Sequence, residues 1–193
     1  MGRPSVFVRL HGCNLRCWFC DTKFDDPNNP VVPVEDLLDQ IVDLRQPLVV
    51  LTGGEPVRQP LGKLVTRLHA AKKTVQIETA GTLWQDCLSE INIVVSPKTP
   101  LIHGKISAFA MAFKYVIRAG EVSDADGLPT MSTQRKGQPG LLARPRPLAP
   151  VYLSPLDEYD PEANDRNRQE VFRLALKHGY IAGIQLHKVF GVR

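Results

Sequence analysis

Long hydrophobic runs are missing from this chain of 193 residues. No apolar stretch approaches the roughly 20 residues that a membrane-spanning helix needs, and residues 1–13 contain no apolar stretch followed by a cleavage site. We therefore expect no membrane partner, no secretion signal and a cytoplasmic location. A strong excess of one charge is also missing. A formal net charge of +4 would help to hold an anionic ligand, but it does not imply nucleic-acid binding, and we expect none.

Cysteine is scarce, and its placement is uneven. Three of the four cysteines, Cys13, Cys17 and Cys20, lie within eight residues, which argues against a disulfide framework. The C-x3-C-x2-C spacing lets one tight loop aim three thiolates at three corners of a cubane iron–sulfur cluster, which leaves the fourth iron open to a small molecule. A Cys3His zinc site that includes His11 stays open as an alternative, as do incidental thiols. We expect Cys87 to be a small buried hydrophobe.

Size and composition are ordinary for one globular domain. Apolar residues make up 43% of the chain and charged residues 23%, and 193 residues are enough to bury a substantial core. We therefore expect a single domain that spans residues 1–193.

Short β-rich runs alternate with amphipathic helical patterns along the chain. The expected strands are residues 5–10, 47–51, 75–78, 91–95, 113–117, 151–153 and 183–186, and the expected helices are residues 34–44, 61–73 and 161–178. This alternation predicts an α/β fold with a mostly parallel sheet. The strands are too few for a closed eight-stranded barrel, so we expect an open partial (β/α) barrel.

Polar signatures directly follow five of these strands. They are the cysteine loop, TGGEP at residues 52–56, ETAG at 78–81, SPK at 96–98 and SPLDE at 154–158. Because ligands bind at the carboxyl ends of parallel strands, we expect these segments to form one site. Residues 127–150 break the pattern, since they contain five prolines and no acidic residue. They predict a long loop insertion, either a plain surface loop or a lid or basic patch that meets a partner.

The order of two motifs resembles the radical S-adenosylmethionine (SAM) superfamily. The cysteine run CNLRCWFC at residues 13–20 comes first, and GGEP at residues 53–56 follows. The resemblance implies that the three cysteines hold a [4Fe-4S] cluster and that SAM chelates its open iron. It also implies that the segment with Gly54 and Glu55 receives the SAM amino group, because glycines allow a close backbone approach and a carboxylate matches an ammonium.

Within that superfamily the chain resembles the 7-carboxy-7-deazaguanine synthase family. The matching segments are GRP at residues 2–4, CDT at 20–22, SPK at 96–98 and QLHK at 185–188. The family converts 6-carboxy-5,6,7,8-tetrahydropterin to 7-carboxy-7-deazaguanine with loss of ammonia, on the route to queuosine and related 7-deazapurines. The implied partners are the pterin, an electron donor of flavodoxin or ferredoxin type, and a second copy of the chain in a homodimer.

The resemblance also assigns roles to single residues. Thr22 would bind Mg²⁺. The SAM contacts would be Phe19, Asp21, Gly54, Glu55, Ser96, Pro97 and Lys98, and the substrate contacts would be Arg3, Thr52, Gln185 and His187. One departure is that the family has a strand and a QGEG-like segment ahead of GRP, which this sequence does not show. We therefore expect the substrate pocket to lack one wall in the chain as given.

Two rival functions stay open. A radical SAM activase of a glycyl-radical enzyme has the same cysteine spacing and a GGEP-like segment, but its Thr22 would need no metal. A zinc module would use Cys13, Cys17, Cys20 and His11 and would carry out no radical chemistry.

Overall fold

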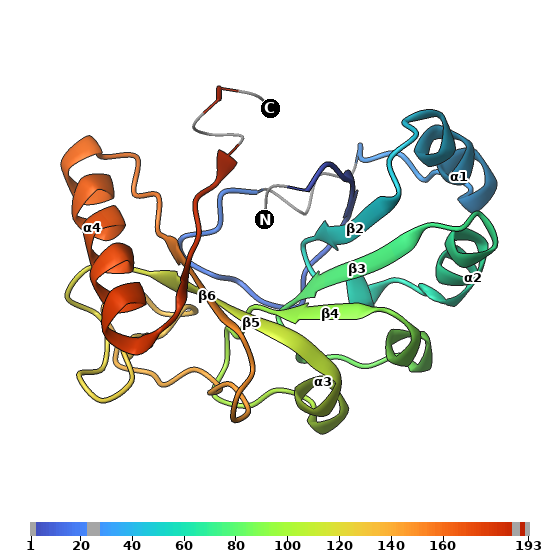
Figure 1. Ribbon diagram of the computed structural model, residues 1–193. Helices are drawn as coiled ribbons and strands as arrows, with labels where there is room; N and C mark the ends of the chain where they lie inside the picture. Colours follow the sequence, from blue (N-terminus) through green and yellow to red (C-terminus); the bar gives the residue numbers. More distant parts are fainter. Residues whose placement is uncertain (1–2, 23–27, 187–189, 192–193) are drawn as a thin grey trace.

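The computed structural model describes residues 3–22, 28–186 and 190–191. Seven strands form one sheet in the order β1-β2-β3-β4-β5-β6-β7, and every neighbouring pair is parallel. The sheet curves but does not close, and its four α-helices lie on the outside of the curve (Figure 1). The expected open partial (β/α) barrel is confirmed.

The element bounds are as follows. The strands are β1 (Val6–Leu10), β2 (Leu48–Gly53), β3 (Thr74–Thr79), β4 (Asn92–Val95), β5 (Ala110–Ile117), β6 (Val151–Pro155) and β7 (Ile181–Ala182). The helices are α1 (Val34–Asp43), α2 (Gly62–Ala70), α3 (Gly104–Phe109) and α4 (Pro161–His178), with two 3₁₀ turns, η1 (Pro56–Arg58) and η2 (Asp86–Glu90).

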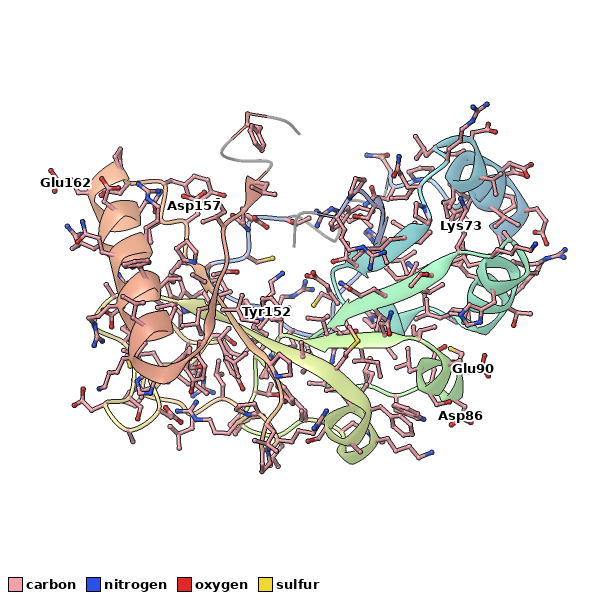
Figure 2. All side chains as sticks on the ribbon, in the orientation of Figure 1. Lys73, Asp86, Glu90, Tyr152, Asp157 and Glu162 are labelled. Atoms are coloured by element: carbon pink, nitrogen blue, oxygen red, sulfur yellow. The ribbon has the colours of Figure 1, made fainter. Side chains whose placement is uncertain are left out.

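Alternation along the strands separates a core face from an inner face. In β1, Val6 and Val8 are buried while Phe7 and Arg9 are exposed. In β3, Val75 and Ile77 are buried, and they join a core that includes buried side chains of α2 and α4. The side chains of the opposite strand face therefore line the hollow of the curved sheet. Figure 2 shows Tyr152 of β6 near the middle of the molecule, whereas Asp86 and Glu90 of η2 lie on the outside of the curved sheet.

Helix α4 begins and ends where its sequence signals predict. Asp160 accepts a hydrogen bond from the backbone N–H of Ala163 (2.7 Å), and Pro161 occupies the first turn. Gly179 then ends the helix in the left-handed conformation, with φ 71°. These local signals explain why the predicted span of residues 161–178 matches the observed one.

One prediction for the fold is wrong, and one helix was missed. The last strand is Ile181–Ala182 and not residues 183–186; Gln185 follows the strand, and Leu186 is helical. Helix α3 was not predicted because six residues are too few to show a helical period.

His187 lies outside the described residues. In the described part of the chain, no helix is both long and apolar enough to cross a membrane.

The segment at residues 127–150 is fastened to the sheet and makes a short hairpin. Isolated antiparallel bridges join Val122 to Pro129 and Met131 to Pro139. The Ala143 N–H donates to the Thr99 carbonyl (2.8 Å), and the Ala143 carbonyl accepts a hydrogen bond from the hydroxyl of Tyr115 (2.7 Å). The segment therefore packs over the carboxyl ends of β4 and β5.

Candidate functional site

The cysteine loop and the glycine pair are joined by backbone hydrogen bonds. The Gly54 N–H donates to the Leu10 carbonyl (3.1 Å), and the Glu55 N–H donates to the Gly12 carbonyl (2.9 Å). These bonds extend the pairing of β1 with β2 past the ends of both strands. They place the start of the cysteine loop directly beside the GGEP segment.

Only glycine fits at these two positions. Gly53 has a φ of 141°, and a Cβ there would lie 2.0 Å from the Leu10 carbonyl oxygen. A Cβ on Gly54 would lie 2.1 Å from the Gly12 carbonyl oxygen. Both obstacles are backbone atoms that cannot rotate away, so the glycines are needed for the close approach of the two segments.

Glu55 is fully buried at 0% exposure, and it ties three segments together. One carboxylate oxygen accepts from Thr79 Oγ1 (2.8 Å) and from the Val57 N–H (3.1 Å), and the other accepts from the Ala80 N–H (2.8 Å). Burial raises the pKa of Glu55, although these hydrogen bonds oppose the rise. Both oxygens are bonded within the protein, and the contact of Glu55 with SAM stays a prediction.

The three cysteines lie on one loop and differ in their surroundings. Cys13 Sγ accepts from the Leu15 N–H (3.4 Å), and Cys17 Sγ accepts from Gln134 Nε2 (3.2 Å). Cys20 is exposed, and its Sγ contacts the Thr22 carbonyl oxygen at 3.5 Å. Burial raises the pKa of the Cys13 thiol, and the nearby Glu55 adds to that rise.

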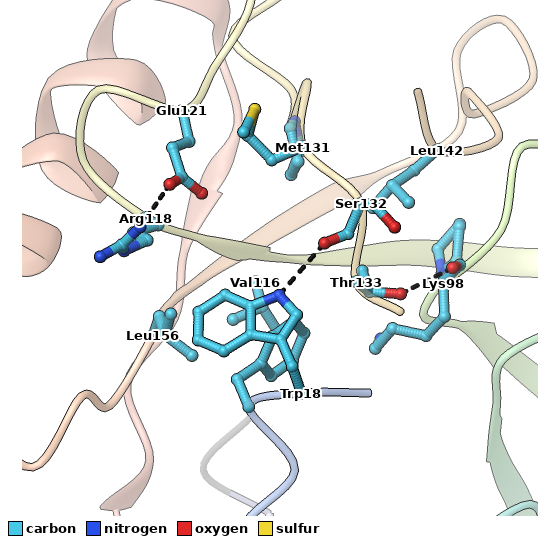
Figure 3. Close-up of a pocket in the computed structure, with 13 residues that line it drawn as sticks. Trp18, Lys98, Val116, Arg118, Glu121, Met131, Ser132, Thr133, Leu142 and Leu156 are labelled. Carbon is cyan, nitrogen blue, oxygen red and sulfur yellow. Dashed lines mark hydrogen bonds and ion pairs between the residues drawn. The ribbon is translucent and has the colours of Figure 1, made fainter. Parts of the chain in front are cut away.

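A pocket lies next to this loop, between the ends of β4, β5 and β6 (Figure 3). Its walls include the rings of Trp18 and Phe19, which meet edge to face with centroids 5.1 Å apart. Val116 on β5 and Leu156 after β6 add apolar surface, and Arg118 lies at the side. The pocket therefore combines aromatic and aliphatic walls with a charged rim, as sites for flat organic ligands do.

Lys98 brings a buried amine to the same pocket. Its Nζ donates to the Ser96 carbonyl (2.9 Å) and to Ser96 Oγ (2.5 Å). Burial lowers the pKa of Lys98 to about 8, although the nearby Cys17 sulfur opposes the shift. The SPK segment is thus placed between the cysteine loop and the pocket, with Pro97 also lining the wall.

Comparisons with known proteins bear on this arrangement. The family model described as "Radical SAM superfamily" matches residues 7–92. The 7-carboxy-7-deazaguanine synthase of Rhodospirillum rubrum is 45% identical over 99% of this chain and 85% of its own length. That of Rickettsia prowazekii is 33% identical over the whole chain and 82% of its own length.

The chain belongs to the 7-carboxy-7-deazaguanine synthase family. The resemblance drawn from the motifs is confirmed by these full-length relatives. QueE from Escherichia coli has the same fold, with a TM-score of 0.65 at 22% identity, over 95% of this chain and 86% of that one. SuiB from Streptococcus suis has a TM-score of 0.55 at 14% identity, over 94% of this chain and 49% of that one, which again shows likeness of fold alone.

The cysteine loop fits the cluster of the radical SAM superfamily, to which this synthase family belongs. Among the described residues, no three His, Cys, Asp or Glu side chains gather closely enough to hold a single metal ion. A zinc ion would require such a gathering, because its sulfur ligands lie about 2.3 Å from the metal. A cubane spreads its ligands over separate irons, so three separated thiolates on one loop suit it better. His11 Nδ1 contacts Asn29 Nδ2 at 2.7 Å.

The other family positions are spread over the rim. Thr52 is half-buried at the end of β2, and Thr22 Oγ1 donates to the Asp21 carboxylate (3.0 Å). Arg3 and Gln185 are exposed, and the structure does not bring them to the cysteine loop through any described hydrogen bond. Gln185 lies beyond β7 and outside the strand that was expected over residues 183–186.

Sequence reasoning missed several residues of the site. Arg118 pairs with Glu158 (2.9 Å) and with Glu121, and its guanidinium lies 5.8 Å from the Trp18 ring centroid. The Lys114 amine pairs with Glu78 (2.7 Å) across the inner face of the sheet. The position of Arg118 directly after a strand was a usable signal, because every other strand end on this rim carries a site segment.

Proposed function

We propose that this chain converts 6-carboxy-5,6,7,8-tetrahydropterin to 7-carboxy-7-deazaguanine with loss of ammonia. The observation that carries the proposal is the 45% identity to a synthase of that name over 99% of the chain. The junction between the cysteine loop and Gly54 adds physical support, because it creates the close backbone approach that the reaction's cofactors need.

Cys13, Cys17 and Cys20 would hold the [4Fe-4S] cluster as thiolates, which leaves one iron without a protein ligand. When bound, the cluster and SAM would supply radical chemistry, in which a hydrogen atom is taken from the substrate and one is given back to the rearranged product. The protein supplies position and exclusion of water. Cys13 and Lys98 are half-buried, which supports a partial exclusion of solvent from the inner side of the loop.

Gly54 would present its backbone to the methionine end of SAM. Glu55 would lie beside the same end of SAM. Its buried carboxylate also holds the end of β2, which carries Gly54, against Ala80 at the end of β3. Phe19 and the backbone of Asp21 would lie against SAM, with the apolar pocket walls beside the adenine and Ser96, Pro97 and Lys98 along the edge. Apolar walls with polar groups at their edge suit a nucleoside.

The substrate would bind over the inner face of the sheet. Arg3 suits a bidentate grip on its carboxylate. Thr52 would donate from the end of β2, and Gln185 and His187 would read the heterocycle edge. Thr22 would hold Mg²⁺, a hard cation that takes oxygen ligands, and the neighbouring Asp21 carboxylate already bonds the Thr22 hydroxyl.

The remaining features complete the proposal. The chain would act as one domain over residues 1–193, as a cytoplasmic homodimer, with reduction by a flavodoxin or ferredoxin. Its product would enter the synthesis of queuosine or a related 7-deazapurine. The relatives that match this chain over its whole length carry the synthase name, which favours the synthase over the glycyl-radical activase.

The test is product formation. The reconstituted, reduced protein is incubated anaerobically with the carboxytetrahydropterin, SAM and Mg²⁺, and 7-carboxy-7-deazaguanine is measured by mass spectrometry. We expect product from wild type and from Cys87→Ser, and none from Cys17→Ser. Absence of product from wild type, and from a form extended upstream of Met1, would count decisively against the proposal.

A second comparison tests Mg²⁺ at Thr22. Thr22→Ser keeps the hydroxyl and should retain the dependence of the rate on Mg²⁺, whereas Thr22→Val should lose most of it. Equal Mg²⁺ dependence in the two variants would remove Thr22 from the metal site while leaving the reaction itself in place.

A further inference from the structure

The segment at Ser132, Thr133 and Gln134 crosses the cysteine loop from the far part of the sequence. The Trp18 N–H donates to the Thr133 carbonyl (3.0 Å), and the Trp18 indole N–H donates to the Ser132 carbonyl (3.1 Å, Figure 3). The Thr133 hydroxyl donates in turn to the Lys98 carbonyl (2.7 Å). A segment that the sequence marks only as a proline-rich insertion therefore holds the cysteine loop against the SPK segment.

The Gln134 side chain has an orientation set by its partners. Its Oε1 accepts a hydrogen bond from the Arg16 backbone N–H (2.8 Å). An N–H can only donate, so the oxygen must face Arg16 and the amide nitrogen must face the other way. That nitrogen lies 3.2 Å from Cys17 Sγ and 2.7 Å from Thr133 Oγ1.

We propose that Gln134 is a positioning residue of the iron–sulfur cluster, whose amide N–H donates to the Cys17 thiolate and raises the reduction potential of the cluster. Hydrogen bonds to cluster sulfurs are among the determinants of that potential. A donor favours the reduced cluster because reduction adds negative charge to the sulfurs. The inference rests on the cluster part of the proposed function and not on the identity of the pterin.

The surroundings strengthen this contact. Thr133 is 5% exposed, and its hydroxyl lies 3.8 Å from Cys17 Sγ. Lys98, the nearby cation, is also enclosed. Gln134 and Cys17 are half-buried, so their hydrogen bond is partly shielded from water and stronger than it would be at an open surface.

Gln134 could act only as a tether, which holds the loop through Arg16, or it could act electrostatically on Cys17. Two substitutions distinguish these roles. Gln134→Leu removes both the acceptor for Arg16 and the donor to Cys17. Gln134→Glu keeps an acceptor for Arg16 but places a carboxylate oxygen beside the thiolate. Gln138→Leu is the matched control, because Gln138 is exposed on the same hairpin and its side chain makes no hydrogen bond in the described part of the chain.

The experiment is a redox titration of the reconstituted cluster without SAM, followed by electron paramagnetic resonance of the reduced state. We expect the potential to fall in the order wild type, Gln134→Leu, Gln134→Glu, with Gln138→Leu equal to wild type. The Leu change should shift the one-electron reduction equilibrium roughly threefold to tenfold, where tenfold corresponds to about 59 mV. A pure tether predicts instead that Glu resembles wild type.

Hydrogen exchange of the Arg16 amide is measured on the cluster-free chains as a check on folding. Exchange should accelerate in Gln134→Leu and stay slow in Gln134→Glu. Potentials that agree with wild type in both Gln134 variants would overturn the inference, even in an enzyme that still makes product. Absence of product from a wild type with an ordinary potential would instead count against the proposed substrate.

Discussion

At the scale of single residues, the site is built from polar groups that burial has changed. Lys98, the last residue of the SPK segment, lies near the Cys17 sulfur, and burial lowers its pKa to about 8 from 10.5. Between these two values the unfolded chain binds more protons at this residue than the folded chain does. The contribution of Lys98 to stability therefore rises with pH across that window.

Comparison with Lys98→Met tests whether the contribution of Lys98 to stability rises with pH. On the cluster-free chain, the unfolding free energy of wild type minus that of the variant should stay level below pH 8 and rise towards pH 10.5, by roughly 3 kcal/mol at most. Chemical denaturation at several pH values measures it. A difference that is flat or falls across this window would show that Lys98 is not held in a poorly hydrated place.

The hydrogen-bond partners of Glu55 could not be predicted from the GGEP motif alone. The GGEP motif pointed to this region of the rim, and the structure places Gly54 beside the cysteine loop. The motif could not show that Thr79, Ala80 and Val57 would take up both carboxylate oxygens. Thr79 and Ala80 lie at the end of β3, more than 20 residues along the chain, so the local sequence does not predict them.

At the scale of elements, the junction between β1 and β2 depends on glycine. Gly53→Ala would set a Cβ 2.0 Å from a backbone oxygen, so either strand must move. We expect a loss of more than about 2 kcal/mol in the free energy of unfolding, together with poor cluster incorporation. Gly62→Ala is the control: it has no atom within 4 Å of the added Cβ and lies at the start of α2, so it should be neutral or stabilising by up to about 1 kcal/mol. Equal stability of the two variants would contradict the close approach.

Helix α4 holds two loops of the pocket through one buried side chain. Asn167 is 1% exposed; it accepts from the Ala119 N–H (2.7 Å) and donates to the Leu156 carbonyl (3.0 Å) and to Glu158 (3.0 Å). Asn167→Leu leaves these groups unpaired, so we expect a loss of about 2–4 kcal/mol in unfolding free energy and weaker SAM binding. Thermal denaturation and SAM titration measure the two effects.

Gln169→Leu is the control for Asn167, because Gln169 is exposed on the same helix. It should change the unfolding free energy by less than about 0.5 kcal/mol and leave SAM binding as it is. If the two variants behaved alike, Asn167 would have no special part in holding the pocket.

The sequence predicted elements well where local signals are strong. Asp160, Pro161 and Gly179 bound α4, and the apolar runs marked the central strands. β7 was misplaced because its two residues are both exposed and show no alternation. The contact of Gln134 with Cys17 spans 117 positions of sequence, and such a contact leaves no local pattern.

At the scale of the whole molecule, the open parallel sheet collects segments from residues 12 to 158 on one rim. The expected fold could be derived from the alternation of strands and helices, since parallel strands send all their following loops to the same edge. Side-chain partners across the rim depend on how far the sheet curves, which sequence patterns do not fix. The QueE structure has the same fold.

Reductive cleavage of SAM tests the central claim most directly. The anaerobically reconstituted and reduced protein should carry about four irons per chain and should release 5′-deoxyadenosine and methionine from SAM, and Cys17→Ser should do neither. A wild-type protein that holds its irons, is reduced, and still leaves SAM intact would contradict the account.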